Sequence, residues 1–234
     1  MFPLKDNVPT RTFPIITVSL IVVNVLVWIW EINGGIDREV IKYGYYPCEV
    51  GGGCIGPATH HQPLVVTLFT SMFMHGGWLH IIGNMLFLWI FGNNVEDAMG
   101  RVRFLTWYVL CGIAATGTQT FVTIAFASPQ DASIPNIGAS GAIAGVLGAY
   151  LLLLPRAQVL TAFFLGFFFF LREIPAIFFL GFWFLFQAWE GGFSLLIPQA
   201  GGGVAFFAHI GGFVFGAATV YLFTRGRRPL SPTW

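Results

Sequence analysis

The chain has 234 residues, of which 56% are hydrophobic and only 9% are charged. Soluble domains carry about 25% charged residues, so this composition excludes an ordinary soluble protein and indicates that lipid is the main solvent. The formal net charge is +1 and no basic stripe is visible, so nucleic acid is not expected as a partner.

Six apolar stretches are long enough, or nearly long enough, to cross about 30 Å of hydrocarbon. They cover residues 14–30, 79–92, 104–126, 140 to about 154, about 174–189, and 204–224. Residues 159–189 are apolar almost throughout, so the start of the fifth helix is poorly defined, and an apolar linker is expected before it. The sequence therefore predicts an all-α polytopic membrane protein built as a bundle of six transmembrane helices.

The basic residues predict the orientation of the chain in the membrane. If both ends are cytoplasmic, only Arg38 and Lys42 lie outside. The basic residues inside are then Lys5, Arg11, Arg101, Arg103, Arg156, Arg172, Arg225, Arg227 and Arg228. We expect a cytoplasmic N-terminus at 1–13, a membrane domain at 14–224 and a cytoplasmic basic tail at 225–234. The first stretch lacks a clear cleavage site and is expected to be an uncleaved anchor.

A long first external loop follows, from about residue 33 to residue 77. Its length and mixed polarity predict a partly ordered structure that lies at the membrane surface. Cys48 and Cys54 fall within it, and on the oxidising side of a membrane they either form a disulfide or stay reduced. A zinc site built from these two cysteines with His60 and His61 is an alternative, although its spacing is atypical.

Four polar residues lie in or beside apolar stretches. Burying a polar side chain in a membrane costs free energy, so each of them needs a structural or functional explanation. His80 and Asn84 are four residues apart and share a face of the second helix. Ser140 opens the fourth helix, and His209 lies near the start of the sixth. Each alone is typical of helix packing or of an interhelical hydrogen bond. These three helices run in the same direction, however, so all four residues fall at a similar depth, which indicates a site.

Glycines on the fourth and sixth helices permit a close approach of the two backbones. They are Gly141, Gly145, Gly148, Gly211, Gly212 and Gly216. Such an approach would bring the hydroxyl of Ser140 within hydrogen-bond reach of His209, and a nucleophilic serine needs such a base. The sixth helix offers no acidic residue to orient the histidine, so a Ser–His dyad is predicted rather than a triad with Asp.

Acyl transfer also requires donors for the oxyanion that forms in the transition state. The backbone N–H of Ser140 lies at a helix N-terminus, where free N–H groups favour negative charge. The Asn84 amide and the His80 imidazole could approach the same point from the second helix. We therefore expect these three groups to form an oxyanion hole.

The motifs HGGWLHIIGN (75–84), GASGAIAG (138–145) and AHIGG (208–212) resemble the rhomboid family of intramembrane serine proteases. The segment NNVEDAMG (93–100) also resembles a motif of that family. The resemblance implies a nucleophile (Ser140), a general base (His209), an oxyanion hole (His80, Asn84 and the Ser140 N–H), a structural or water-organising histidine (His75), and supporting glycines (Gly138, Gly141 and Gly212).

The same resemblance implies how such a protein works. Its substrates would be single-pass membrane proteins, cut within or beside their transmembrane segment, and neither a metal nor a cofactor is expected. The first loop would lie partly in the outer leaflet, and the fifth helix with the last external loop would gate entry. The lack of a long N-terminal extension favours a bacterial inner membrane, with the active site open to the periplasmic side.

Two departures from the family pattern are visible. Some members carry Trp-Arg in the first loop, where this chain has Val66-Thr67. Some also carry an aromatic residue four positions after the nucleophile, stacked on the catalytic histidine, where this chain has Ala144. Neither change removes a catalytic group, but the anchoring of the first loop and the support of the His209 ring are left open.

Several rival interpretations fit less well. A soluble hydrolase elbow has the pattern G-x-S-x-G after a strand, whereas Ala142 takes the last position here. The zinc-protease motif H-E-x-x-H is absent, and His75 and His80 are five apart, so a zinc site with His209 is disfavoured. A transporter would place polar groups deeper, within inverted repeats. The serious alternative is a non-catalytic relative that binds or escorts transmembrane segments.

Overall fold

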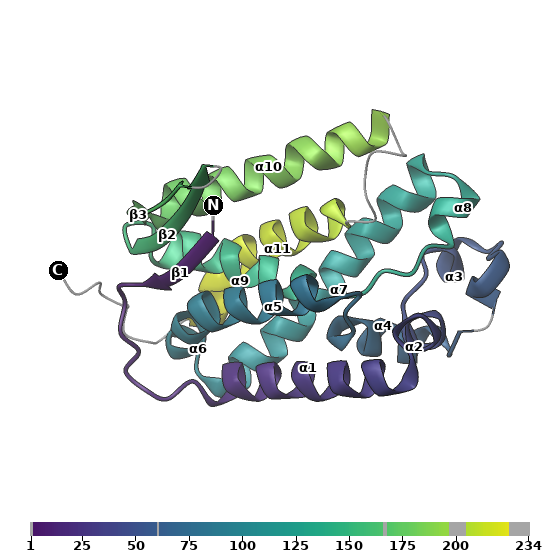
Figure 1. The fold of residues 1–234 in the computed structure, drawn as a ribbon, viewed down its shortest axis with the longest axis horizontal. Helices are drawn as coiled ribbons and strands as arrows, with labels where there is room; N and C mark the ends of the chain where they lie inside the picture. The colour runs from purple at the N-terminus through teal and green to yellow at the C-terminus, as the bar shows by residue number, and fades with distance from the viewer. Residues whose placement is uncertain (1, 60, 166–167, 197–204, 225–234) are drawn as a thin grey trace.

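The helices of the computed structural model pack side by side around one short central helix (Figure 1). The structure describes residues 2–59, 61–165, 168–196 and 205–224. Within these residues, four helices are long and apolar enough to cross a membrane. They are α1 (Ile15–Gly34), α7 (Arg101–Phe126), α10 (Ala176–Leu196) and α11 (Phe206–Thr224). The predicted helical membrane bundle is thereby confirmed.

A bent pair of helical segments makes a fifth candidate span among the described residues. Its second arm is one continuous rod that changes from α-helix to π-helix and back. The rod consists of α5 (Trp78–Phe87), the π-helical turn η3 (Leu88–Gly92) and α6 (Asn93–Met99). The first arm, Leu64–Phe73, meets this rod at an angle of 80°. The second predicted stretch is therefore longer at both ends than 79–92.

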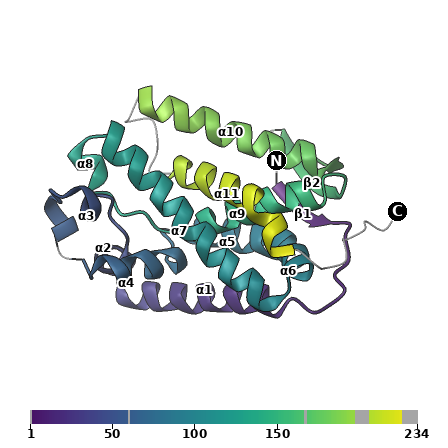
Figure 2. The same ribbon diagram turned by 180° about the vertical axis from the view of Figure 1, so that it is seen from behind.

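The central helix is α9 (Ser140–Leu153), whose residues 141–150 are all buried. It packs most extensively against α11 and α7, and these helices lie together in the view from behind (Figure 2). Small residues make this burial possible, because they leave room for the backbones of neighbouring helices. At 14 residues, α9 is shorter than the other spans, so a total of six spans stays a prediction.

The long first loop is ordered as a chain of short helices, as expected. They are α2 (Ile36–Tyr43), α3 (Cys48–Gly51), the 3-10 turn η1 (Gly56–Thr59), α4 (Leu64–Thr70) and the 3-10 turn η2 (Ser71–Phe73). Cys48 and Cys54 form a disulfide. The zinc alternative is excluded for these two cysteines, because their sulfur atoms are bonded to each other.

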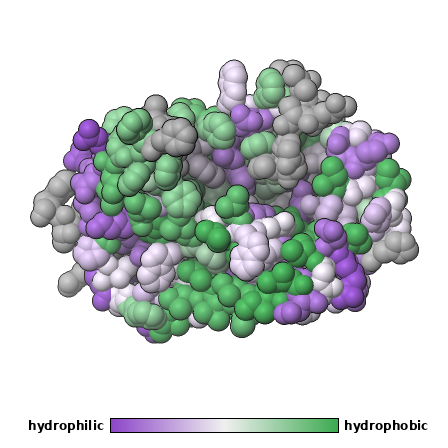
Figure 3. Space-filling view, in the orientation of Figure 1, coloured by the Kyte–Doolittle hydropathy of each residue, from purple (hydrophilic) through white to green (hydrophobic). Residues whose placement is uncertain are grey.

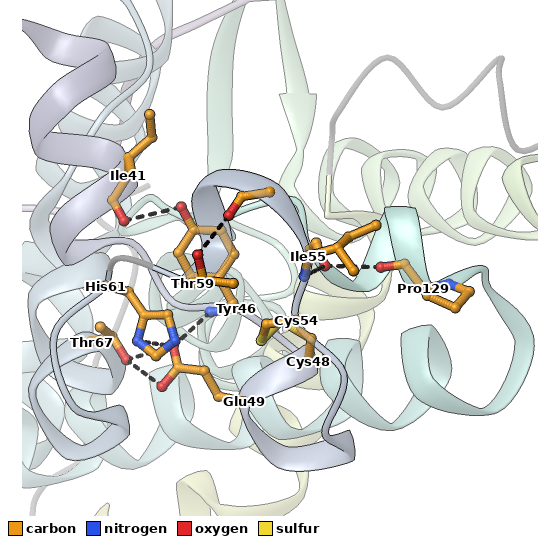
Figure 4. The surroundings of a disulfide bond; sticks show 12 residues. Ile41, Tyr46, Cys48, Glu49, Cys54, Ile55, Thr59, His61, Thr67 and Pro129 are labelled. Atoms are coloured by element: carbon orange, nitrogen blue, oxygen red, sulfur yellow. Dashed lines mark hydrogen bonds and ion pairs between the residues drawn. A yellow bond between two sulfur atoms is a disulfide. The ribbon is translucent and has the colours of Figure 1, made fainter.

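The carboxylate of Glu49 anchors this loop (Figure 4). It accepts hydrogen bonds from the hydroxyl of Thr67 at 3.2 Å and from the backbone N–H of Tyr46 at 3.2 Å. His61 lies 3.6 Å from the same carboxylate. Thr67 belongs to the Val66-Thr67 pair that replaces Trp-Arg, so hydrogen bonds to Glu49 answer how this chain ties its loop together.

A three-stranded sheet is the main departure from the expected all-helical chain. Strand β1 (Phe2–Asp6) pairs with β2 (Gln158–Leu165), which pairs with β3 (Phe168–Pro175). Both pairs are antiparallel. The apolar linker predicted before the fifth helix is therefore a β-hairpin, and the N-terminal segment completes its sheet. The predicted basic tail (225–234) lies outside the described residues.

Candidate active site

Ser140 and His209 are joined by a hydrogen bond, with 2.8 Å between the serine Oγ and the histidine Nε2. Ser140 is the first residue of α9, and His209 lies in the first turn of α11. The two helices touch through glycine, since a Cβ on Gly212 would lie 2.0 Å from the carbonyl oxygen of Gly141. The structure thus brings together the two residues that the sequence proposed as a dyad.

Not every glycine has the predicted neighbour. Gly216 packs on Gly145 of α9, as expected. Gly211 instead faces α7, where a Cβ would lie 2.2 Å from the Thr118 hydroxyl oxygen. The expectation that Gly211 contacts the fourth helix is wrong, because adjacent residues on a helix point about 100° apart and so meet different neighbours.

The length of α9 sets the depth of Ser140. Fourteen residues span roughly 21 Å at 1.5 Å per residue, against about 30 Å of hydrocarbon. A helix this short begins beneath the membrane surface if its other end reaches the opposite one. The segment that leads down to it includes Gly138, whose φ of +120° favours glycine.

Gln187 is a site residue that the sequence analysis missed. Its Oε1 lies 2.7 Å from Nδ1 of His209, and its side chain is buried. Trp183, one turn earlier on α10, places its ring 5.9 Å from the His209 ring, centroid to centroid. These two residues support the histidine, which answers the question raised by Ala144. The sequence did contain a signal for Gln187, because an amide side chain within an apolar stretch is costly in a membrane and so indicates a function.

His80 presents one ring nitrogen to the site. Its Nδ1 accepts a hydrogen bond from the backbone N–H of Gly76 at 3.3 Å, which leaves the proton on Nε2. A Cβ on Gly138 would lie 2.7 Å from that Nε2 and 3.6 Å from the Ser140 Oγ, so both atoms face the same point. His80 therefore carries an N–H beside the serine.

Asn84 is buried on the next turn of α5, and its amide nitrogen makes no hydrogen bond within the described residues. An unpaired buried N–H donor costs about 1–3 kcal/mol, so such a group needs an explanation. Asn84 lines the same cavity as Ser140 and His80. The amide is thus a donor available to a bound group.

His75 lies behind the site rather than in it. It is fully buried, and its ring packs edge-on against His80 with 5.0 Å between the centroids. Its backbone N–H donates to the carboxylate of Glu31 on α1, and its Nδ1 lies 3.2 Å from the carbonyl oxygen of Phe73. These contacts fix the turn before α5.

A cavity of about 860 Å³ opens beside the serine. Its walls come from α5 on one side and α10 on the other, with α9 at its floor, and the surface is hollowed between α10 and α5 (Figure 3). Its lining includes His80, Asn84, Ser140, Ala144, Trp183 and His209. A space of this size holds an extended peptide segment. The last external loop, expected to gate it, falls mainly on 197–204 and lies outside the described residues.

These features define a class: a helical membrane protein with a half-buried, hydrogen-bonded serine–histidine pair and an unpaired amide donor beside one cavity. The family model described as Rhomboid domain matches residues 62–226, which is most of the chain. The chain belongs to the rhomboid family.

Relatives in several organisms agree with this assignment. The human presenilin-associated rhomboid-like protein, mitochondrial, is 27% identical over 223 residues, covering 92% of this chain and 51% of the relative. A zebrafish (Danio rerio) presenilin-associated rhomboid-like protein A, mitochondrial, is 33% identical over 103 residues, covering 44% and 25%. The putative rhomboid protease YdcA of Bacillus subtilis is 36% identical over 84 residues, covering 36% and 39%. The matches thus cover between a quarter and about half of each relative.

Proposed function

We propose that this protein is an intramembrane serine protease that hydrolyses peptide bonds in or next to transmembrane segments of single-pass membrane proteins. The observation that carries the proposal is the 2.8 Å hydrogen bond between Ser140 and His209, which is set beside a cavity with an unpaired amide donor. A packing serine needs neither a basic partner nor an open space.

In the proposed reaction, His209 Nε2 accepts the hydroxyl proton as the Ser140 Oγ attacks the substrate carbonyl carbon. The carbonyl oxygen becomes an oxyanion, which receives hydrogen bonds from the Ser140 N–H, the Asn84 amide and the His80 Nε2–H. His209 then gives its proton to the leaving amine. A water molecule, activated by the same histidine, hydrolyses the acyl-enzyme and restores the serine.

The substrate must be locally unwound before it reacts. An intact helix uses its carbonyl groups in internal hydrogen bonds, and neighbouring turns shield them from attack. Substrates with helix-destabilising residues near the outer end of the segment should therefore be cut best. The proposed route of entry lies between α5 and α10, because residues of both helices line the cavity.

The membrane in which the protein acts is also a proposal. Its apolar helices make it an integral membrane protein. The names of the human and zebrafish relatives give mitochondria as their location, whereas the Bacillus relative is bacterial. The relatives therefore do not single out a bacterial inner membrane, and the asymmetry of the basic residues supports placing both termini on the inner side of whichever membrane holds the protein.

Covalent labelling of Ser140 tests the proposal. A fluorophosphonate should label the folded wild-type protein, and it should label neither Ser140→Ala nor His209→Ala. Both variants should also lose cleavage of a reconstituted, helix-destabilised transmembrane substrate. Ser19→Ala is the matched control, since Ser19 is exposed on α1 and its hydroxyl donates to the Ile15 carbonyl oxygen of the same helix. Absence of labelling in a folded wild-type protein would instead support a non-catalytic protein that escorts transmembrane segments.

A further inference from the structure

We propose that Gln187 is a positioning residue for His209, an inference that rests on the proposed function. The amide oxygen of Gln187 lies 2.7 Å from Nδ1 of the histidine. An amide oxygen only accepts hydrogen bonds, so the proton of the neutral ring is held on Nδ1. Nε2 is then unprotonated and can accept the proton of the Ser140 hydroxyl, which lies 2.8 Å away.

The other neutral tautomer would stop the reaction. With its proton on Nε2, His209 would donate to the serine oxygen and could not act as the base. It would also leave the buried Gln187 oxygen facing an unprotonated nitrogen. Within the described residues no other hydrogen bond to the Nδ1 atom of His209 occurs, so Gln187 takes the orienting part that an aspartate has in a Ser–His–Asp triad.

Gln187 also links the catalytic pair to a wall of the cavity. Ser140 and His209 belong to α9 and α11, whereas Gln187 belongs to α10. The tautomer of His209 therefore depends on α10 being packed against α11 at this level. If α10 moves to admit a substrate, the hydrogen bond is lost until α10 returns.

Two substitutions of Gln187 distinguish a role in positioning His209 from a role in stabilising the fold. Gln187→Met keeps the length of the side chain and removes the acceptor, so kcat should fall about 10- to 100-fold, the equivalent of one buried hydrogen bond, with KM nearly unchanged. Gln187→Glu restores an acceptor and should recover most of the rate. Phe186→Leu, at an exposed position one residue earlier, is the matched control and should keep the wild-type rate.

Each result decides the matter. An unchanged kcat in Gln187→Met would overturn the proposal, as would equal losses of activity and thermal stability in both Gln187 variants, because such losses indicate only a structural role. The nitrogen chemical shifts of His209 in the wild-type protein give an answer that needs no activity. They should show a protonated Nδ1, and an unprotonated Nδ1 would contradict the proposal. If the wild type neither cleaves nor is labelled, it is the proposed protease function that fails.

A second inference concerns the hairpin formed by β2 and β3, called here the aromatic hairpin. We infer that the end of this hairpin formed by residues 163–164 and 168–171, called here its tip, inserts into the lipid interface of the leaflet opposite to the mouth of the active site. The hairpin follows the C-terminal end of α9, whereas Ser140 begins that helix. Phe164, Phe168 and Phe169 are 68%, 80% and 67% exposed.

Both faces of the tip are apolar. Successive residues of a strand point to opposite faces, yet residues 168–171 are all large, apolar and exposed. Among the described residues, strand β1 pairs only with the part of β2 between Val159 and Ala162, so it ends short of the tip. In water an open, apolar edge of this kind promotes aggregation. Charged residues appear only toward the base, at Arg172 and Glu173.

The hairpin continues into a surface that already faces lipid. Strand β3 ends at Pro175 and α10 begins at the next residue, with Ile177 and Phe178 exposed. Hydrophobic side chains predominate in the part of the molecule where Figure 1 places β2, β3 and the start of α10, next to a hydrophilic margin at the left edge (Figure 3). A hairpin cannot span hydrocarbon, because its edge N–H groups need water, but exposed Phe and Leu side chains can be buried at the boundary between headgroups and acyl chains, as they are on surface-bound amphipathic segments.

Spin labels on the aromatic hairpin test this inference. A nitroxide is placed at Phe169→Cys or, as control, at Glu173→Cys, in a Cys111→Ala background reconstituted in phosphatidylcholine vesicles. The nitroxide at position 169 should collide more often with oxygen, which concentrates in lipid, than with a water-soluble nickel chelate. The nitroxide at position 173 should show the reverse preference. Preferential access of the nickel chelate to position 169 would overturn the inference. Dipolar broadening with low access to both reagents would also overturn it, because a second copy of the chain would then cover the tip.

Discussion

Gly212 and Gly141 bring the backbones of α11 and α9 into direct contact, and the distance leaves no space for a side chain. A Cβ on Gly212 would lie 2.0 Å from the Gly141 carbonyl oxygen. Gly141 directly follows Ser140, and Gly212 lies about one turn after His209, so this contact adjoins the hydrogen bond between Ser140 and His209. The separation of Ser140 and His209 is therefore set by two residues that carry no functional group.

Gly212→Ala should consequently impair both stability and catalysis. The helices must move apart, at a cost of about 1–3 kcal/mol for overpacking, and the serine–histidine distance should grow with them. Thermal unfolding in detergent and the rate of fluorophosphonate labelling measure the two effects. Gly117→Ala on α7 is the control, since a Cβ there meets nothing within 4 Å. Wild-type labelling of Gly212→Ala would contradict this account of the site.

Removal of an oxyanion donor should lower kcat without preventing the fold. Asn84→Ala removes an amide nitrogen that has no hydrogen-bond partner within the described residues. The free energy of unfolding of the substrate-free protein should therefore change little. In the reaction, the loss of one donor should reduce kcat about 100- to 1000-fold. Asn33→Ala, at an exposed position of α1, should have no effect. If Asn84→Ala retains full kcat on a transmembrane substrate, Asn84 is not part of an oxyanion hole.

Glu96 should matter for stability rather than for chemistry. Its buried carboxylate accepts hydrogen bonds from the backbone N–H groups of Ile16 and Thr17, at 3.0 and 2.7 Å, and so caps the first turn of α1. Glu96→Gln removes the charge that faces the helix N-terminus and should lower the free energy of unfolding by about 1.5–3 kcal/mol. Denaturation of the purified protein measures this loss. Glu173→Gln, at an exposed position, should change little; equal stabilities would disprove the cap.

The disulfide should stabilise the first loop without taking part in catalysis. Cys48 and Cys54 are six residues apart, and closing so short a loop contributes about 2 kcal/mol. A reductant should therefore lower the Tm of the wild-type protein, while labelling of Ser140 persists. The double variant Cys48→Ser/Cys54→Ser should start at the lower Tm and be insensitive to reductant. A wild-type Tm that ignores reductant would show that the bond is absent or without effect.

Much of the site could be anticipated because polar groups are conspicuous in apolar helices. The free-energy cost of placing a polar side chain in lipid was enough to single out Ser140, His80, Asn84 and His209. Their similar depth in the membrane followed from counting residues along the helices. Gln187 carries the same signal but lies in a stretch whose boundaries the sequence left undefined. Its importance depends on α10 packing beside α11, and no residue spacing along the chain encodes that contact.

The sequence by itself determined the solvent, the helical segments and the residues able to do chemistry, because hydrophobicity and the cost of burying polar groups are local properties. Tertiary structure alone decided that the apolar linker is a hairpin, that β1 joins its sheet, and that Gly211 faces α7 while Gly212 faces α9. These outcomes depend on which distant surfaces meet. A run such as residues 159–171 is apolar without a period, so it fits a helix or a strand equally well until its neighbours are in place.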